Sequence, residues 1–371
     1  MDGGANHIPQ AQTGLPSALY TDPDQIARGT AALLRGGWAG LAVTGQVPEA
    51  GDALPLDFTG IPLLLIRGRD GVVQVFQNVC RHRGVTLVDA PRRIEGAIRC
   101  PYHSWCYATD GRLVATPHVG GPGRNTCDGI DKAALGLLEV RSHLWRDVVW
   151  IDLTGEAPPF DEAMADPIAR WADFADAPLH HDSAFELAPR TDWKLAVENF
   201  CEAYHLPWVH PGLNSYSRLE DHYDITGDGH AGQGTRVYRQ IRGEDGGVFP
   251  DFPGLPARWD TEAEYLACFP NVLLGVHRDH AFAIVLLPQG PADAPVTREL
   301  VHLYYAVPDP DPALAARNAA QWREVFEEDV GVVEAMQRGR AAPGFDGGTL
   351  SPAMDGPTRH FHDWVRRRMA A

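Results

Sequence analysis

The chain lacks the features of membrane-spanning and secreted proteins. None of its 371 residues falls in a run of the roughly 18 apolar residues that a bilayer span requires, and the strongest apolar runs, Ile61–Ile66 and Ala281–Leu287, are short. The N-terminal residues, MDGGANHIPQAQTG, hold neither the basic nor the apolar segment of a secretory signal. We therefore expect a soluble, cytoplasmic protein that does not associate with a membrane.

Basic residues and cysteines are also scarce. The 32 Lys and Arg residues face 49 Asp and Glu residues, a net charge of −17, which argues against a broad basic surface for nucleic acid. Six cysteines are few for this length, and a cytosolic setting disfavours disulfides, so each thiol is either buried packing or a metal ligand. Repeats and low-complexity tracts are absent, and the composition is that of an ordinary globular protein.

The length favours two domains, and the sequence divides accordingly into three parts. Residues 1–40 predict a loose start and a helix over Ile26–Leu34 that ends at a Gly-Gly pair. Residues 41–155 predict a small all-β domain, because short β-like runs alternate with glycine turns: Ile61–Arg67, Val72–Phe76, Ile94–Arg99, Leu137–Val140 and Val148–Leu153. Residues 156–371 begin with a Pro- and Ala-rich connection and then mix strands with helices.

In this last part the strands gather without strand–helix–strand alternation, which favours an α+β domain with an antiparallel sheet. The predicted strands are Ser183–Leu187, Arg236–Ile241, Tyr265–Phe269, Val272–Val276, Ala281–Leu287 and Glu299–Val307. The predicted helices are Asp192–His205 and about Pro312–Arg338.

A first cluster of metal-binding residues lies in the all-β part. It reads Cys80-x-His82, then seventeen residues, then Cys100-x-x-His103. Two cysteines and two histidines can hold tetrahedral zinc or a Rieske [2Fe–2S] cluster, in which two histidines replace two cysteines on one iron. Each half pairs one cysteine with one histidine, which favours the cluster.

A second cluster lies in the segment DWKLAVENFCEAYHLPWVHP, residues 192–211. Glu202 and His205 are three apart and are neighbours on a helix. On a continuous helix His205 and His210 would diverge by about 140°. Because Pro207 disfavours helical geometry in the residue before it, we expect the helix to break near Leu206 and to bring His210 back beside His205.

A carboxylate is expected to complete this site, and Asp329 is the candidate. It lies within the apolar stripe of the C-terminal helix, which comprises Trp322, Val325, Phe326, Val332, Val333 and Met336. An ionised carboxylate there is costly unless it is paired or binds metal. Pairing with a buried arginine remains the alternative to a two-histidine, one-carboxylate set for non-haem Fe(II).

With these motifs the chain resembles the large, catalytic (alpha) subunit of the Rieske non-haem iron oxygenases. Cys80-x-His82 and Cys100-x-x-His103 resemble the cluster motif of that family, ENFCEAYHLPWVH its iron motif, and EEDVGVVEAMQRG the segment with its iron carboxylate. The resemblance covers about residues 30–340. It implies an α+β protein: an all-β Rieske domain followed by a helix-grip, START-like catalytic domain.

The resemblance also implies the chemistry. A [2Fe–2S] cluster would be held by Cys80, His82, Cys100 and His103, and a mononuclear Fe(II) by His205, His210 and Asp329. The subunits would form a ring-shaped homotrimer, in which Glu202 bridges the iron of one subunit to the cluster of its neighbour. Electrons would come from NAD(P)H through a flavin reductase, sometimes with a ferredoxin. The implied activity is O2-dependent hydroxylation or oxidative demethylation of a small organic substrate.

The position of Glu202 bears on the substrate. Aromatic-ring dioxygenases resembling this chain have Asp there, whereas Glu resembles the branch that acts on carnitine, betaine and related quaternary ammonium compounds. Ala203 and Leu206 stand where that branch usually has cysteines. A cationic substrate requires aromatic rings near the iron, and the candidates are Trp208, Tyr216, Phe249, Phe252, Trp259 and Phe269.

Other functions compete with this interpretation. An aromatic-ring dioxygenase would share both metal sites, and a non-enzymatic Rieske electron-transfer protein would need only the first half of the chain. A zinc hydrolase or a helix-grip binding module would carry out no redox chemistry. Asn199, one turn before Glu202, is either a weak distal partner of the iron or a residue that hydrogen-bonds within its helix.

Overall fold

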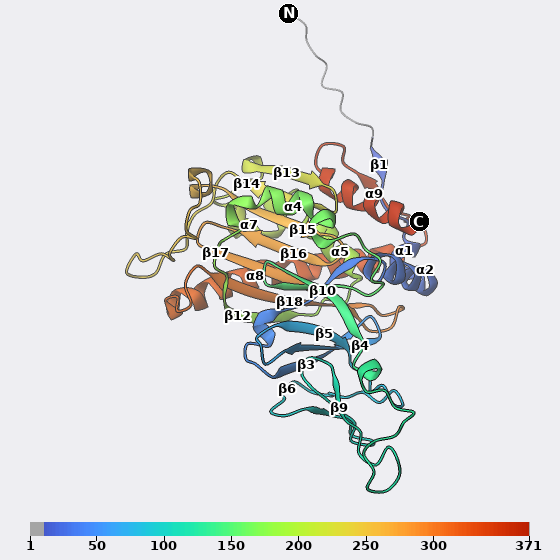
Figure 1. Ribbon diagram of the computed structural model, residues 1–371. Coiled ribbons are helices and arrows are strands. Elements are labelled where there is room, and N and C mark those ends of the chain that lie inside the picture. The colour runs from blue at the N-terminus through green and yellow to red at the C-terminus, as the bar shows by residue number, and fades with distance from the viewer. Residues whose placement is uncertain (1–10, 371) are drawn as a thin grey trace, which may run out of the picture. The chain divides into compact units, whose positions relative to one another are not determined.

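The computed structural model describes residues 11–370. Contacts divide the chain into two units, Leu41–Glu156 and the remainder. The predicted fold class, an all-β part followed by an α+β part with an antiparallel sheet, is confirmed (Figure 1).

The first unit is built around a seven-stranded sheet in the order β2-β11-β10-β5-β4-β3-β6, with a second, three-stranded sheet in the order β7-β8-β9. The strand β11 is buried along its length and β4 is buried over Leu63–Ile66, which explains why their apolar runs predict them well. The ten strands are β2 (Trp38–Val43), β3 (Asp52–Phe58), β4 (Ile61–Arg67), β5 (Val73–Gln77), β6 (Arg92–Arg93), β7 (Ile98–Arg99), β8 (Cys106–Tyr107), β9 (Leu113–Ala115), β10 (Glu139–Trp145) and β11 (Val148–Asp152).

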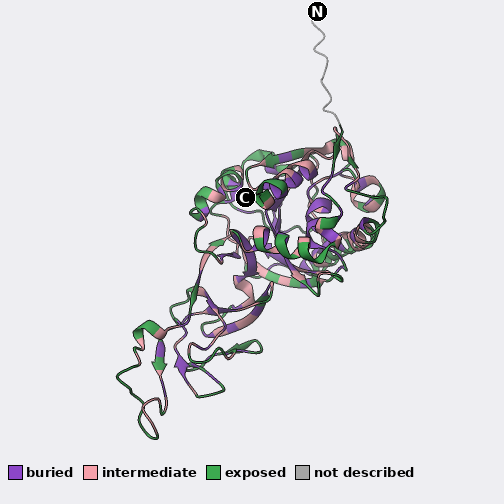
Figure 2. Ribbon diagram, turned by 90° about the vertical axis from the view of Figure 1, so that its right-hand side faces the viewer, coloured by how far each residue is buried: buried purple, intermediate pink, exposed green. Residues whose placement is uncertain are grey.

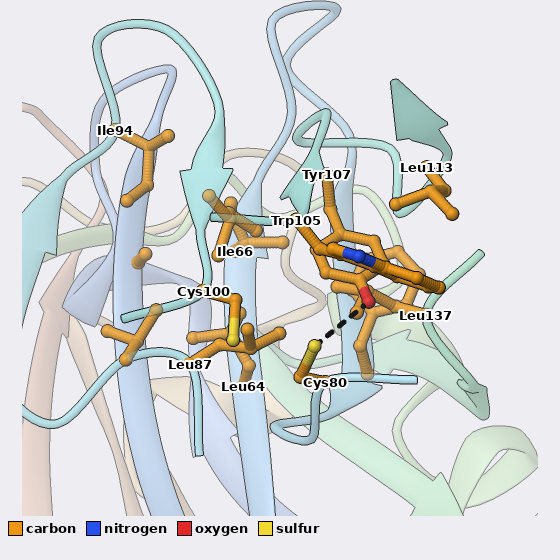
Figure 3. Packing of buried hydrophobic residues seen from close by; sticks show 14 residues of the cluster. Leu64, Ile66, Cys80, Leu87, Ile94, Cys100, Trp105, Tyr107, Leu113 and Leu137 are labelled. Carbon is orange, nitrogen blue, oxygen red and sulfur yellow. Dashed lines mark hydrogen bonds between the residues drawn. The ribbon is translucent and has the colours of Figure 1, made fainter. Parts of the chain in front are cut away.

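The core of this unit contains both cysteines of the first cluster. Cys80 and Cys100 lie among Leu64, Leu87 and Trp105 with their neighbours, as Figure 3 shows. The thiols thus belong to a continuous apolar cluster, in which burial removes them from water.

The second unit contains a seven-stranded antiparallel sheet in the order β12-β18-β17-β16-β15-β14-β13. Its strands are β12 (His180–Leu187), β13 (His222–Gly227), β14 (His230–Thr235), β15 (Ala263–Cys268), β16 (Val272–Val276), β17 (His280–Gln289) and β18 (Val296–Tyr305). The predicted strand Arg236–Ile241 is wrong, because this segment leaves the sheet after β14 and forms a loop. A small sheet pairs β1 (Gln12–Thr13) with β19 (Thr349–Leu350).

Helices cover this sheet. The longest is α8 (Pro312–Arg340), and it contacts α5 (Trp193–Phe200), the helix that carries Asn199. Figure 2 shows the buried residues of the described chain in purple. The other helices are α1 (Ala18–Thr21), α2 (Pro23–Gly29) with a π-helical turn at Thr30–Leu34, α3 (Phe160–Ala163), α4 (Ala165–Arg170), α6 (Leu206–Val209), α7 (Pro211–Asn214) and α9 (Gly356–Ala370), with short 3-10 turns between them.

The helix predicted over Asp192–His205 is shorter than expected. Asp192 caps it by accepting a hydrogen bond from the Lys194 backbone, but α5 ends at Phe200. The carboxylate of Glu202 accepts a hydrogen bond from the backbone N–H of Tyr204, which in a continuing helix would bond the Phe200 carbonyl. The chain therefore leaves the helix before Glu202 rather than at Leu206.

Candidate metal centres

The two halves of the first cluster form loops of the same design. The backbone N–H of Cys80 donates to the Val85 carbonyl at 2.8 Å, and that of Gly84 returns to the Cys80 carbonyl at 3.0 Å. In the second loop, the N–H of Cys100 donates to the Trp105 carbonyl at 2.8 Å, and that of Ser104 returns to Cys100 at 3.1 Å. Gly84 and Ser104 both have positive φ, of 74° and 56°. Each loop therefore presents one cysteine at its base and one histidine at its tip.

Burial separates the two kinds of donor. Cys80 and Cys100 are each 2% exposed, whereas His82 and His103 are exposed. The two imidazole rings lie 4.8 Å apart between centroids, so they converge on one place. The sulfur side of the site is thus inside the apolar core, and the imidazole side faces the surface.

Two aromatic residues support the loops. The indole of Trp105 stacks on the His82 ring at a centroid distance of 4.8 Å. The hydroxyl of Tyr107 lies 3.3 Å from Cys80 Sγ and accepts the backbone N–H of Arg81 at 2.9 Å (Figure 3). Burial raises the pKa of Tyr107, with the Cys80 contact adding to the effect, so the hydroxyl stays protonated and can donate to the sulfur.

The kinds of donor and their burial fit a two-iron cluster. The four donors are two buried thiols, of Cys80 and Cys100, and two exposed imidazoles, of His82 and His103. A [2Fe–2S] cluster, with thiolates on one iron and imidazoles on the other, matches the donor set and the burial.

The group that does converge consists of His205, His210 and Asp329. His205 and His210 flank the short helix α6, so one helical turn returns the chain and places the two rings 5.1 Å apart between centroids. Asp329 comes from α8. Its Oδ1 lies 3.1 Å from His210 Nε2 and 3.8 Å from His205 Nε2. Nitrogen and oxygen donors in this number suit a mononuclear iron with open positions.

An unsatisfied atom supports a metal at this place. Asp329 Oδ1 is buried and, within the described part of the chain, accepts no aligned hydrogen bond despite the nearby ring nitrogens. A buried carboxylate oxygen without a partner is costly. A cation bound between the three side chains would remove that cost, so the residues present fit a metal ion.

The outer nitrogen of each histidine is held by a carboxylate. Glu202 Oε1 lies 2.7 Å from His205 Nδ1, and Glu328 Oε2 lies 2.7 Å from His210 Nδ1. Such bonds fix the tautomer that leaves Nε2 free to bind a metal and orient the ring. Burial alone would lower the pKa of His210, but Asp329 and Glu328 outweigh it and raise that pKa. Both imidazoles are therefore oriented by acids before any metal binds.

Glu328 is a residue that sequence reasoning missed. It falls outside the apolar stripe of α8, and its partner His210 lies 118 positions away in the chain. The contact between Glu202 and His205 was expected from helical spacing. The contact is present, but the two residues lie in the turn between α5 and α6 and not on a helix.

A cavity opens beside the three converging residues, and aromatic rings line much of it. These rings are Phe200, Tyr265, Phe282, Trp322 and Phe326. The Phe282 ring lies 4.8 Å from Trp322 and 5.3 Å from Phe326 between centroids. Asn199 also lines the cavity, and its side chain has no hydrogen-bond partner in the described part of the chain, so the alternative of bonding within its helix is not realised.

The aromatic residues nominated from the sequence are largely elsewhere. Trp208 is 71% exposed, and four others are at most 3% exposed and line neither this cavity nor its continuation: Phe249, Phe252, Trp259 and Phe269. Of the six, only Tyr216 lines a pocket next to this cavity, with which the cavity shares Tyr265 and Trp322. The aromatic lining comes from α5, β15, β17 and α8, where aromatic residues in an apolar run look like ordinary core residues.

Two family models match the chain. The model described as the Rieske [2Fe-2S] domain matches residues 37–128, and the model described as the ring hydroxylating alpha subunit (catalytic domain) matches residues 175–371. The first range contains the Cys80 and Cys100 loops, and the second contains His205, His210 and Asp329.

Relatives cover nearly the whole chain at low identity. The chloroplastic choline monooxygenase of Arabidopsis thaliana is 26% identical, over 94% of this chain and 81% of its own length. The glycine betaine monooxygenase oxygenase subunit of Chromohalobacter salexigens is also 26% identical, over 97% and 86%. The solved structure of a quaternary ammonium Rieske monooxygenase, CntA, with L-carnitine matches with a TM-score of 0.79 at 20% identity, over 97% and 96% of the two chains. None of the described helices is long and apolar enough to cross a membrane.

Proposed function

Because the chain belongs to the Rieske non-haem iron oxygenases, as a ring-hydroxylating alpha subunit, we propose that its substrate is a quaternary ammonium or amine compound. The enzyme is an oxidoreductase that uses O2 and electrons from a reductase to hydroxylate or oxidatively demethylate a small organic molecule. Its cofactors are a Rieske [2Fe–2S] cluster and a mononuclear iron. Competing functions without redox chemistry, and electron transfer alone, do not account for both matched domains.

The observation that carries the proposed substrate class is the aromatic wall beside the converging His205, His210 and Asp329. Rings of Phe282 and Trp322 lie within 4.8 Å of each other and border the same cavity as the three donors. The faces of aromatic rings attract cations, quaternary ammonium groups above all. A methylammonium group held there would lie next to the metal. The names of the relatives, choline and glycine betaine monooxygenases, support this chemistry.

Each site residue has a proposed role. His205, His210 and Asp329 hold the iron, which when bound supplies O2 activation. Cys80, Cys100, His82 and His103 hold the cluster, which supplies single electrons. Glu202 orients His205 and relays electrons and protons, while Glu328 orients His210. Asn199 lies beside the cavity as a distal polar neighbour of the iron.

The proposed partners follow from this electron path. NAD(P)H is the ultimate donor through a flavin reductase, with or without a ferredoxin. We propose a homotrimer in which the cluster of one subunit serves the iron of a neighbour. The relative from Chromohalobacter salexigens is named an oxygenase subunit, which supports a separate reductase. A cytoplasmic location stays a prediction.

Labelled oxygen tests the proposed function. The holoenzyme, supplied with NADH, a flavin reductase and ¹⁸O2, is offered trimethylammonium compounds in parallel with aromatic acids. We expect substrate-dependent O2 uptake with the ammonium compounds and one labelled atom in the product. A demethylation would instead release formaldehyde, in which label is sought before exchange with water.

Two labelled atoms in an aromatic diol would identify a dioxygenase and contradict the proposal. O2 uptake that no ammonium compound or amine stimulates would contradict it as well. The variant Asp329→Ala is the matched control, because it removes a proposed iron ligand and leaves the Rieske unit unchanged.

A further inference from the structure

The cavity beside the metal-binding residues continues away from them. Leu213, His222, Tyr265 and Trp322 line both the part that contains Asp329 and a second part, which we call the distal pocket. The distal pocket is bordered by the loop that follows β14, where Arg239 is located. A molecule longer than a single ammonium group would extend from the aromatic wall into this pocket.

Arg239 is an exposed cation that lines the distal pocket, and its nearest charge interaction in the described chain is with the Tyr216 hydroxyl. Its side chain makes no hydrogen bond, ion pair or ring contact with any residue of the described part of the chain, although it lines the distal pocket. The neighbouring arginines are used differently: Arg236 lies 4.7 Å above the Tyr223 ring, and Arg242 donates to the Gly246 carbonyl. A guanidinium offers five donors in a planar fork that matches a carboxylate.

The remaining lining of the distal pocket does not neutralise this charge. It contains no Asp or Glu, and burial lowers the pKa of His277 well below its usual value, so that imidazole is uncharged. Asp279 accepts hydrogen bonds from Tyr238 at 2.7 Å and His280 at 2.9 Å, and it does not line the pocket. Arg239 is therefore positioned to meet a negative charge supplied by a ligand.

The two ends of the cavity thus differ in what they attract. Near Asp329, whose carboxylate is assigned to the metal, the aromatic rings favour a cation, and at the distal pocket Arg239 favours an anion, with the amides of Asn318 and Gln321 as further polar groups on the lining. Different preferences at the two ends of one cavity select the orientation of a dipolar molecule.

We propose that Arg239 binds a carboxylate of the substrate, so that the enzyme acts on a zwitterionic ammonium carboxylate rather than on an amino alcohol or a simple amine. This inference rests on the proposed function. It assigns the ammonium end of the substrate to the aromatic wall and the carboxylate to the distal pocket. Arg239 is then a specificity-determining residue that does not touch the reacting atoms.

Equilibrium binding to the holoenzyme tests this assignment without turnover. The probes are matched pairs that differ in one end: glycine betaine against choline, and γ-butyrobetaine against 4-trimethylammonio-1-butanol. Isothermal titration of the resting enzyme under argon gives Kd for each. We expect the wild type to prefer the carboxylate of each pair, and Arg239→Gln to weaken that member by about 10- to 100-fold, as expected for loss of a charge-assisted hydrogen-bonded pair.

Controls separate charge from structure. Arg236→Gln makes the same change in charge three residues earlier, outside the cavity, and should leave every Kd within about twofold. Arg239→Lys keeps the charge and should recover part of the affinity. Binding of choline and its longer analogue should be the same in Arg239→Gln as in the wild type.

The outcomes distinguish this inference from the proposed function. If the alcohols bind as tightly as the carboxylates, and Arg239→Gln changes neither, the carboxylate assignment is overturned while the ammonium oxygenase stands. If no ammonium compound binds but an aromatic carboxylate does, and that binding depends on Arg239, the proposed ammonium substrate is overturned and an anion at Arg239 is retained. Equal weakening of all ligands would reduce Arg239 to a structural role.

Discussion

Asp329 lies on the inward side of α8, between the buried residues Phe326 and Val333. Its side chain is 21% exposed and points toward the Nε2 atoms of two histidines. The neighbouring Glu328 takes the outer nitrogen of His210 instead. Two successive acids thus contact opposite nitrogens of the His210 imidazole, Glu328 at Nδ1 and Asp329 at Nε2. Of the two, Asp329 is on the side where a metal would be bound.

Replacing Asp329 by Ala is expected to remove the mononuclear iron. Two histidines alone do not complete the expected three-ligand set. Because the cluster residues belong to the other unit, the visible spectrum of the cluster should persist. Metal analysis should fall from three irons per two labile sulfides to two per two, and oxygenation should be lost.

Glu327→Ala is the matched control for Asp329→Ala. Glu327 is exposed, its carboxylate lies 3.6 Å from Arg323 on the same helix, and it should keep all the iron. An Asp329→Ala protein that retains three irons and turns over substrate would show that Asp329 is not a ligand.

Single residues also show what sequence could predict. The position of Asp329 followed from the spacing of Trp322, Phe326 and Val333, because helical period depends on local sequence alone. Glu328 has no such signal, because its role as the hydrogen-bond partner of His210 depends on where that histidine, from another element, lies in the fold. Arg239 was invisible for a related reason: an unpaired cation is recognised only when its surroundings are known.

At the scale of elements, a buried ionic cluster connects the helices around the metal site. The carboxylate of Glu198 on α5 accepts a hydrogen bond from the Tyr20 hydroxyl of α1. It also pairs with Arg340 at the end of α8 and with His362 of α9, each at 3.2 Å. Glu198 is 5% exposed and Arg340 6%. Burial by itself would raise the pKa of Glu198, but His362, Arg340 and Tyr20 outweigh burial and lower it.

Glu198→Gln is expected to destabilise the fold by about 3 kcal/mol, because it leaves the Arg340 charge buried without its partner. The effect has a defined pH dependence. A carboxylate with a lowered folded-state pKa stabilises above its unfolded pKa of about 4.3, and this stabilisation is lost as pH falls through the folded value. Urea midpoints of wild type and variant should therefore differ most near pH 7 and converge in acid.

Glu186→Gln provides the comparison for this experiment. Glu186 pairs with Arg298 at 2.6 Å, but it is 44% exposed, so its loss should cost less than about 1 kcal/mol. A Glu198→Gln protein as stable as wild type at pH 7 would show that the cluster contributes no net stability.

Elements differ in how well sequence predicts them. The runs that became β16 and most of β17 were predicted because they are continuously apolar and buried, and β4 was predicted from its apolar run, which is buried over Leu63–Ile66. The strand β14, with the sequence HAGQGT, has almost no apolar residue and was missed. Its glycines are required by close packing, since a Cβ on Gly232 would lie 2.0 Å from the Tyr265 carbonyl oxygen. Pattern reasoning cannot detect a strand that is specified by the space its neighbours leave.

At the scale of the whole molecule, the order of the two units and their cofactors follows from motifs that are local in sequence. The cluster loops span residues 80–105, and both iron histidines lie within six residues. Each motif can therefore be recognised without knowledge of the fold. The homotrimer and the path between cluster and iron have no such local signature. They depend on contacts between copies of the chain and remain proposals.

Glu202 offers a test of that electron path. In the proposed trimer its carboxylate bonds His205 Nδ1 on one side, at 2.7 Å in this chain, and His103 of the neighbouring subunit on the other. Glu202→Gln keeps the volume but removes the negative charge and one acceptor. With Fe(II) in excess, the variant should retain both metals and the trimer, yet its pre-reduced cluster should fail to reoxidise in a single turnover with substrate and O2.

Glu328→Gln separates the electron path from simple support of a metal ligand, because Glu328 makes the same bond to the other histidine at the same distance. Loss of either carboxylate should weaken iron binding by about 10- to 100-fold, which excess Fe(II) overcomes. If Glu202 relays electrons, cluster reoxidation should stop in Glu202→Gln and proceed in Glu328→Gln. Equal rates in the two iron-loaded variants would assign Glu202 the same orienting role as Glu328 and place the electron path elsewhere.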